Sequence, residues 1–166
     1  MLFRSQSSSR SLTSASAPRG IRVAKRAGMR AQRPRGPAAT FVNVVSGNAE
    51  TVDGLEAYLR RAGVETATTR ALEKLAATTP PRAAAVVIFP DDFEFESVVR
   101  HVGALAAGRA DLLVVFVTKD PKRFNALELS AGVALLVIPR PAWGWTILDA
   151  IRARLDPPST EGESTE

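Results

Sequence analysis

The chain has 166 residues, 45% of them hydrophobic, which is enough for one ordinary domain with tails. It contains 22 lysines and arginines against 17 acidic residues, a formal net charge of +5. The absence of cysteine and the presence of a single histidine, His101, exclude disulfide frameworks, thiolate metal sites and multi-histidine metal sites. The longest apolar runs have the length of strands, so we expect a cytoplasmic protein without a membrane span.

The positive charge is concentrated in an N-terminal arm, residues 1–40. No acidic residue precedes Glu50, whereas nine basic residues lie in the arm: Arg4, Arg10, Arg19, Arg22, Lys25, Arg26, Arg30, Arg33 and Arg35. The last ten residues, 157–166, form a tail that holds three acids: Glu161, Glu163 and Glu166. The body, residues 41–156, keeps 13 basic and 14 acidic residues, a net charge of −1. This balance does not support a nucleic-acid-binding body.

The arm is rich in serine, arginine, glycine and proline and shows little apolar periodicity, so we predict that it is disordered. Three interpretations of the arm stay open: a solvated extension without a function of its own, a tail that binds nucleic acid or another anionic surface, and an organelle transit peptide. A fourth is that translation begins near Met29. The acidic tail is likewise predicted to be disordered.

The body alternates strand and helix patterns. In chain order we predict a strand at 41–45, a helix capped by Asn48 and stopped by Gly63, a strand at 64–68, a helix at 71–77, a strand at 84–89, a helix at 94–107, a strand at 112–117, a helix at 121–130, a strand at 133–138 and a helix at 143–155. Strict alternation of this kind predicts a parallel sheet with helices on both faces. Functional loops then lie at the carboxyl ends of the strands.

Four short motifs in the body follow one another in the order and spacing of a known family. They are Val44-Val45-Ser46-Gly47-Asn48, Val115-Phe116-Val117-Thr118, residues 125–132 and Val137-Ile138-Pro139-Arg140-Pro141. Over essentially all of 41–156, the chain resembles the receiver domain of bacterial two-component response regulators (CheY-like). The resemblance implies an α/β, flavodoxin-like (βα)5 three-layer sandwich with a five-stranded parallel sheet of order 2-1-3-4-5.

The resemblance also implies a phosphorylation pocket, in which an Asp after strand three accepts a phosphoryl group and an acidic pair after strand one holds Mg²⁺. In this chain the acidic pair corresponds to Ser46 and Gly47, followed by Asn48. A unit charge about 4 Å from a cation contributes roughly 4 kcal/mol at an effective dielectric near 20, before desolvation. We therefore expect a cleft without anionic ligands, neutral or cationic, with no bound metal and no cofactor.

The acceptor position is ambiguous, because Phe89 or Pro90 stands there when no gap is allowed. Asp91 and Asp92 follow, and either can reach the pocket. The more natural interpretation places both acids in the first turn of the helix at 94–107, where they favour its dipole.

Three cleft positions after strands four and five complete the comparison with the family. Thr118 fits the switch threonine, and Arg140 stands in place of the family's lysine. Arg140 is expected to pair with Asp91 or Asp92 and close the pocket. Lys119 replaces a small residue, and we expect it to crowd phosphate access.

Trp143 and Trp145 open the last helix. Two tryptophans so close together favour one in the core and one partly exposed. The resemblance implies partner contacts through helix four, strand five and helix five. Lys119, Pro141, Trp143 and Trp145 are therefore the candidate partner-binding residues.

Our preferred hypothesis is a stand-alone pseudo-receiver, a signalling adaptor that is not an enzyme and binds protein partners without aspartyl phosphorylation. The alternative is an atypical phosphorylatable receiver in a phosphorelay, using Asp91. An enzyme on the same sheet is less favoured, because the sequence shows no glycine-rich phosphate loop and no nucleophile elbow. Nucleic-acid binding through the arm alone is a fourth class. The oligomeric state stays open.

Overall fold

The computed structural model describes residues 40–129 and 132–156. The chain divides into two units, Met1–Arg35 and Gly36–Glu166, and the described residues belong to the second. The predictions for the basic arm and the acidic tail lie outside the described residues, so they stay predictions.

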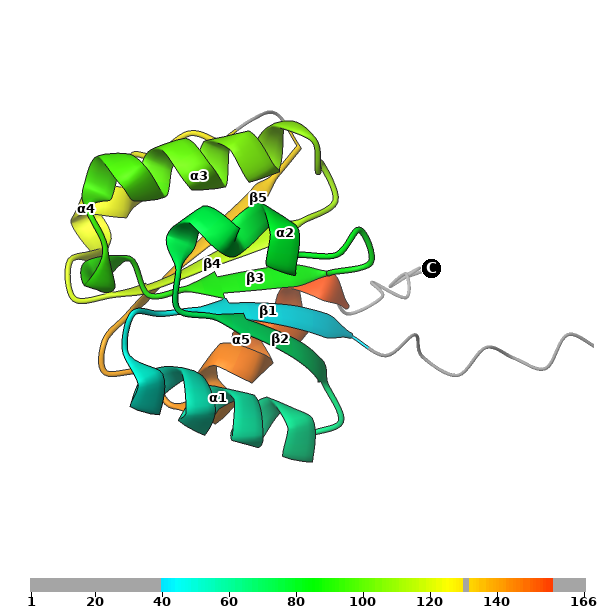
Figure 1. The fold of residues 1–166 in the computed structure, drawn as a ribbon. Coiled ribbons are helices and arrows are strands. Elements are labelled where there is room, and N and C mark those ends of the chain that lie inside the picture. Colours follow the sequence, from blue (N-terminus) through cyan, green and yellow to red (C-terminus); the bar gives the residue numbers. More distant parts are fainter. Residues whose placement is uncertain (1–39, 130–131, 157–166) are drawn as a thin grey trace, which may run out of the picture. The chain divides into compact units, whose positions relative to one another are not determined.

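Five parallel strands form one sheet in the order β2-β1-β3-β4-β5 (Figure 1). The strands are β1 (Phe41–Val45), β2 (Glu65–Thr69), β3 (Ala85–Ile88), β4 (Leu113–Thr118) and β5 (Ala134–Pro139). The apolar runs at 41–45 and 84–89 become central strands because both faces of these strands are covered. The predicted fold class and strand order are confirmed.

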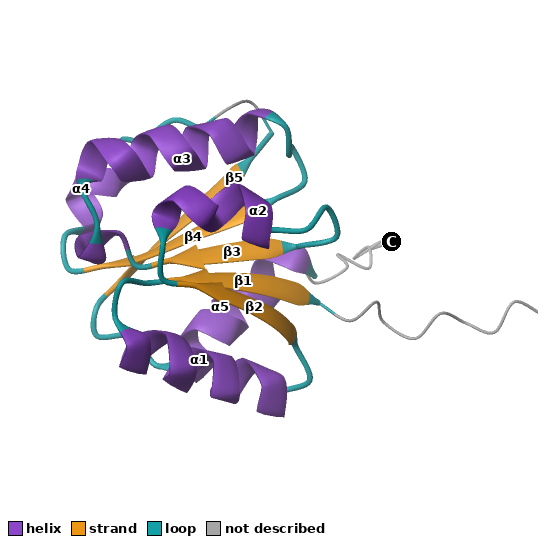
Figure 2. Ribbon diagram, in the orientation of Figure 1, coloured by secondary structure: helices purple, strands orange, loops and turns teal. Residues whose placement is uncertain are grey.

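Helices cover both faces of this sheet, which gives three layers (Figures 1 and 2). One face carries α1 (Ala49–Arg61) and α5 (Gly144–Leu155). The other carries α2 (Leu75–Thr78), α3 (Phe95–Ala107) and α4 (Pro121–Asn125). None of the helices within the described ranges has the length and apolar character that crossing a bilayer requires.

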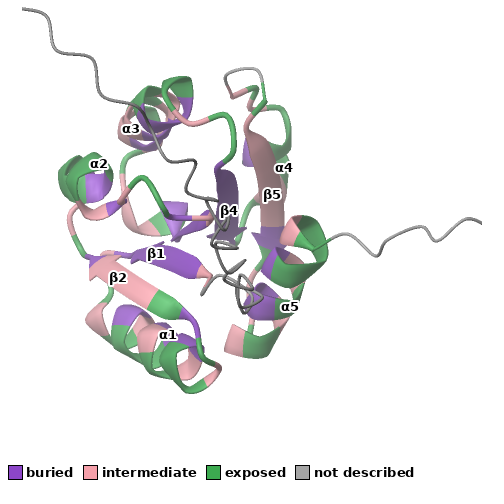
Figure 3. Ribbon diagram, turned by 90° about the vertical axis from the view of Figure 1, so that its right-hand side faces the viewer, coloured by how far each residue is buried: buried purple, intermediate pink, exposed green. Residues whose placement is uncertain are grey.

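The core consists of two apolar clusters, one on each face of the sheet. Every residue of β1, β3 and β4 is buried, whereas most of β2 and β5 is half-buried or exposed (Figure 3). One buried polar residue is Asn43 in β1, which donates hydrogen bonds to Thr78 Oγ1 at 3.0 Å and Thr79 Oγ1 at 2.7 Å. These bonds fasten the end of α2 to the sheet. Among the described residues, Asn43 Oδ1 has no partner.

The signals for the first helix are confirmed. Asn48 Oδ1 accepts a hydrogen bond from the Thr51 N–H at 3.1 Å and so caps α1. Gly63 follows the helix end with φ of +81°, a left-handed conformation that favours glycine.

Two predicted helices are shorter in the structure. The segment predicted as a helix at 71–77 is a 3₁₀ turn at Leu72–Lys74 followed by the short α2, with Leu72 and Leu75 both buried. Pro80 and Pro81 prevent α2 from extending further.

The helix predicted at 121–130 ends at Asn125. Leu127 and Leu129 both pack on the core cluster beneath α3. Residues two positions apart do not share a helix face, so a continued helix would turn one of these leucines away from the core.

Candidate functional site

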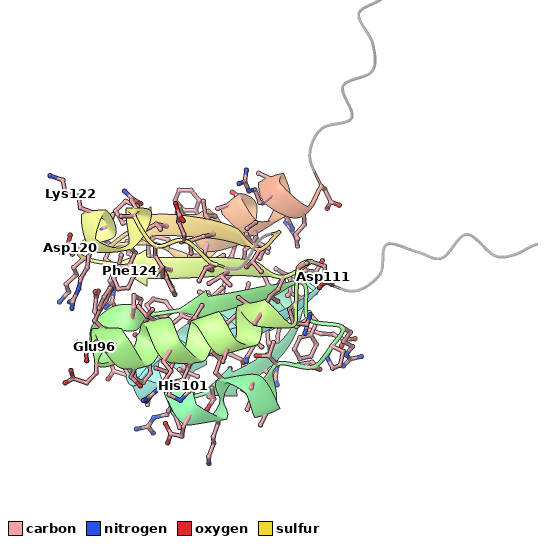
Figure 4. All side chains as sticks on the ribbon, turned by 90° about the horizontal axis from the view of Figure 1, so that it is seen from above. Glu96, His101, Asp111, Asp120, Lys122 and Phe124 are labelled. Carbon is pink, nitrogen blue, oxygen red and sulfur yellow. The ribbon has the colours of Figure 1, made fainter. Side chains whose placement is uncertain are left out.

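The connections that follow β1, β3, β4 and β5 meet at one end of the sheet, where parallel strands present their carboxyl ends (Figure 1). Figure 4 marks this end by Asp120 and Phe124, which follow β4, while Asp111 before β4 lies at the opposite end. The predicted pocket residues occupy these connections.

The turn after β1 holds a neutral hydroxyl where the resemblance to receiver domains implies an acid. Ser46 is fully buried, and its Oγ donates a 2.5 Å hydrogen bond to Asp92 Oδ2 while accepting one from the Asn48 N–H. A Cβ at Gly47 would lie 3.2 Å from Asp92 Cβ, so glycine lets Asp92 approach this turn closely. The structure thus brings Ser46, Gly47, Asn48 and Asp92 together at the end of β1.

Asp91 is held by three partners on the other side of the cleft. Its Oδ1 accepts a hydrogen bond from the buried Thr118 hydroxyl at 2.6 Å. Its Oδ2 accepts one from the Lys119 backbone N–H at 2.8 Å and lies 3.5 Å from Arg140 Nη1. The expected pairing of Arg140 with one of the two acids is therefore found at Asp91.

The interpretation of both acids as first-turn residues of α3 is wrong. They lie in a separate 3₁₀ turn, η2 (Pro90–Asp92), which begins with a proline whose missing N–H costs nothing there. Phe93 is extended after it, with φ of −136° and ψ of 163°, and α3 starts only at Phe95. The extra turn directs Asp91 and Asp92 toward opposite sides of the cleft.

The pKa of Asp91 lies below its ordinary value of 3.8. Partial burial raises this pKa, but the hydrogen bonds from Thr118 and Lys119 and the positive charge of Arg140 favour the ionised form and together outweigh burial. The Asp91 carboxylate is therefore a firmly ionised group that is already solvated by the protein.

Arg140 extends β5 and reaches back over the cleft. Its backbone N–H donates to the Thr118 carbonyl at 2.8 Å, and its guanidinium carbon lies 5.2 Å from the centre of the Phe89 ring. The Arg140–Pro141 peptide bond is cis, and Pro141 is exposed.

Lys119 contributes its backbone to the cleft. The contact with Asp91 comes from the Lys119 N–H, and the residue itself is exposed. A hollow of about 310 Å³ beside Asp91 is lined by Lys119 and by Pro90, Phe93, Phe95, Asp120, Arg123 and Phe124.

The expectation of a cleft without anionic ligands is wrong in part, because the Asp91 and Asp92 carboxylates both lie in it. Each is already engaged by protein donors. Within residues 40–129 and 132–156, no group of three or more acidic, histidine or cysteine side chains is arranged to hold a metal ion. Because Asp91 and Asp92 are bonded to protein donors on opposite sides of the cleft, they do not present the converging pair of free carboxylates that the resemblance implies for Mg²⁺.

Both tryptophans are exposed, Trp143 by 68% and Trp145 by 56%, so the expectation that one lies in the core is wrong. The buried row of α5 runs through Ile147 and Ile151, and one helical turn before Ile147 that row passes through Gly144. Trp143 is the extended residue that precedes α5 and Trp145 lies in its first turn, and both side chains reach the surface.

No family model matches the amino-acid sequence, and no curated protein matches it. Among solved structures, a response regulator receiver domain protein (CheY-like) from Methanospirillum hungatei is 16% identical with a TM-score of 0.59, over 72% of this chain and 95% of that chain.

Two further solved structures show the same likeness. A response regulator receiver protein from Burkholderia phymatum is 23% identical with a TM-score of 0.54, over 70% of this chain and 94% of that one. The non-phosphorylated HemR receiver domain from Leptospira biflexa is 17% identical with a TM-score of 0.53, over 70% and 94%. Identities this low establish architecture and not chemistry. The described domain therefore has the fold of a response regulator receiver domain.

Proposed function

We propose that this protein is a pseudo-receiver, a non-enzymatic signalling adaptor that binds a protein partner without aspartyl phosphorylation. The observation that carries the proposal is the arrangement of Asp91. Both of its oxygens are occupied by Thr118, Lys119 and Arg140, while Ser46 and Gly47 provide no charge for a metal.

Phosphoryl transfer to a carboxylate needs a free oxygen as nucleophile and a cation that offsets the charge of the donor. Asp91 has a lowered pKa, and its oxygens are engaged by N–H and O–H donors, so it is a weak nucleophile. Asp92 is bonded to Ser46. Phosphoryl transfer of the kind that a working receiver performs is therefore disfavoured at both Asp91 and Asp92.

The Asp91 carboxylate also supplies the negative charge that a phosphoryl group would bring to the cleft. In the receivers that this chain resembles, the threonine and the lysine follow the phosphoryl charge. Here Thr118 and Arg140 are held by the fixed negative charge of Asp91. We infer that this internal anion keeps the cleft in one state, so that partner binding does not depend on phosphorylation.

The adaptor surface that we propose consists of α4, β5 and the start of α5. β5 is an edge strand of six residues, of which only Ile138 is buried. Exposed Pro141, Trp143 and Trp145 follow it, and Lys119 precedes α4. Exposed aromatic side chains beside a half-covered apolar strand are the residue types that anchor protein interfaces.

The alternative function is a phosphorylatable receiver of a phosphorelay that uses Asp91. The observation in its favour is that the 3₁₀ turn brings the Asp91 carboxylate next to Thr118 and Arg140, the positions that would follow a phosphoryl group.

Exposure of the full chain to Mg²⁺ with acetyl phosphate, and separately with beryllofluoride, distinguishes the two functions. The pseudo-receiver predicts no added phosphoryl group by intact mass, no bound fluoride signal by ¹⁹F NMR and no shift of the Thr118 amide. An adduct that survives in Asp92→Asn and disappears in Asp91→Asn would establish the alternative instead.

A further inference from the structure

A groove of about 530 Å³ lies between α1 and the start of α5. Its buried lining residues are apolar, namely Leu55, Phe89 and Ile147, and its aromatic rim is formed by Tyr58 and Trp143. This volume and this apolar lining with a few polar groups match small-molecule sites, which typically measure about 300–1,000 Å³.

Two glycines shape this groove. Gly54 lies in the middle of α1, where glycine is less favourable than alanine because it loses more conformational freedom on folding. Apart from its chain neighbours and the nearby backbone of α1, no described atom lies within 4 Å of the position that a Gly54 Cβ would take, so packing inside the domain does not demand glycine there. What glycine provides is access to the helix backbone from the groove. At Gly144 the Tyr58 ring would lie 2.8 Å from a Cβ, so this ring rests on the start of α5 and is a fixed wall.

The charged groups that line the groove are Arg140 and Glu50. Arg140 is the better placed for a ligand, because its 3.5 Å ion pair with Asp91 engages one nitrogen of a guanidinium that has five N–H donors. Glu50 is an exposed residue of the first turn of α1. The aromatic rim favours a flat ring, and Arg140 favours a negative charge on it.

We propose that the groove binds a small planar aromatic molecule carrying an anionic group, and that the bound anion draws Arg140 away from Asp91. Arg140 belongs to both places, lining the groove and pairing with Asp91 in the cleft. Ligand binding in the groove thereby takes the place of phosphorylation as the signal to which the adaptor responds. The coupling part rests on the proposed function, whereas the groove as a binding site does not.

The probe is 2-naphthoate, with 2-naphthalenemethanol as its neutral counterpart, each titrated into the full chain and followed by ¹H–¹⁵N NMR. The amides of Gly54 and Gly144 should shift with saturation. Because a charge-assisted bond to Arg140 is available only to the carboxylate, naphthoate should bind about tenfold more tightly than the alcohol. Absence of saturable shifts with naphthoate would overturn the proposal.

Matched variants locate the site. Gly54→Leu should abolish binding by filling the groove, whereas Gly103→Leu should preserve it, because Gly103 is also a mid-helix glycine without neighbours within 4 Å but lies in α3. Arg140→Gln should erase the tenfold preference for the anion, and Glu50→Gln should tighten naphthoate and not the alcohol. Equal binding by wild type and Gly54→Leu would overturn the proposed site.

The coupling has its own readout, the Lys119 amide, which donates to Asp91 and does not line the groove. Saturation with naphthoate should shift this amide in the wild type and leave it unmoved in Arg140→Gln. A shift at Gly54 without a shift at Lys119 would overturn the coupling. A beryllofluoride adduct at Asp91 would overturn the pseudo-receiver function and leave the groove result standing, so the two failures are distinguishable.

Discussion

The neighbouring acids Asp91 and Asp92 have different partners on the two sides of the cleft. On the charged side, Asp91 is bonded to Thr118 and Lys119 and paired with Arg140. On the neutral side, Asp92 receives the Ser46 hydroxyl beside Gly47. Asp91 and Asp92 are adjacent in the chain, yet of the two only Asp91 has a cation within salt-bridge distance among the described residues.

This difference can be compared with the phosphorylation pocket that the resemblance to receiver domains implies. The charged side keeps the groups that respond to a negative charge, together with a built-in negative charge. The neutral side lacks the carboxylate pair that would hold a metal, and a hydroxyl–carboxylate bond takes its place. This difference supports our proposal that the pocket holds one state and does not switch by phosphorylation.

Restoring the acidic pair should produce the largest change. In the double variant Ser46→Asp with Gly47→Asp, each added carboxylate about 4 Å from Mg²⁺ contributes several kcal/mol at an effective dielectric near 20, before desolvation. Mg²⁺ affinity, measured by calorimetry, should therefore rise by orders of magnitude over wild type.

The matched control for the acidic pair is Ser46→Asn with Gly47→Asn, which adds similar bulk near Asp92 without charge. Without Mg²⁺ the acidic variant should be the less stable of the two in urea unfolding, because its new carboxylates repel Asp92. A Mg²⁺ affinity equal to that of the control would contradict the claim that missing carboxylate charge prevents Mg²⁺ binding.

Replacing Asp91 and Asp92 by alanine, one at a time, compares the two sides of the cleft directly. Asp91→Ala leaves the buried Thr118 hydroxyl and the Lys119 N–H without their acceptor and should cost about 2–3 kcal/mol of unfolding free energy. Asp92→Ala removes one bond, from Ser46, and should cost about 1 kcal/mol. Urea unfolding of both variants measures the difference, and equal losses would contradict the asymmetry.

The sequence predicted the sheet well because continuous apolar runs and helix-ending residues are local signals. Each predicted strand lies within one residue of the observed one, and Asn48 and Gly63 bound α1 as expected. The errors at α2 and α4 arose where tertiary packing of Leu75 or Leu129 decided the backbone.

The sequence predicted which residues gather at the site but not how their side chains are arranged. Which residues gather in the cleft followed from parallel topology, because all of them follow strand ends. The 3₁₀ turn that separates Asp91 from Asp92 depends on how Pro90 packs, and a helix-dipole argument could not reveal it. The bonds of Asn43 with Thr78 and Thr79 join residues 35 and 36 positions apart, beyond any local signal.

Asp91, on the charged side of the cleft, should contribute to the pH dependence of stability. The pKa of Asp91 is lowered in the folded state, so its contribution is fully present above its ordinary pKa of 3.8 and is lost as pH falls from there through the lower folded value. Urea unfolding between pH 6 and pH 2, values chosen to span the titration of a carboxyl group, should show a smaller acid loss in Asp91→Asn than in wild type. Identical profiles would mean that Asp91 is not held as described.

Replacement of Arg140 by lysine should give the smallest effect. The charge beside Asp91 is kept, and an ion pair at 3.5 Å with side chains 24% and 21% exposed contributes little beyond charge. We expect less than about 1 kcal/mol in urea unfolding, with Arg140→Gln losing more. A larger loss in the lysine variant would indicate that the stacking of Arg140 over Phe89 matters more than its charge.

The most direct test of the account is a Mg²⁺ titration of the full chain followed by ¹H–¹⁵N NMR at the amides of Gly47, Asp92 and Thr118. If the cleft is closed by its own hydrogen bonds and lacks metal ligands, these amides will show no saturable shift at millimolar Mg²⁺. Saturable shifts confined to these amides and removed by Asp92→Asn would contradict it, because they would place a divalent ion where the account allows none.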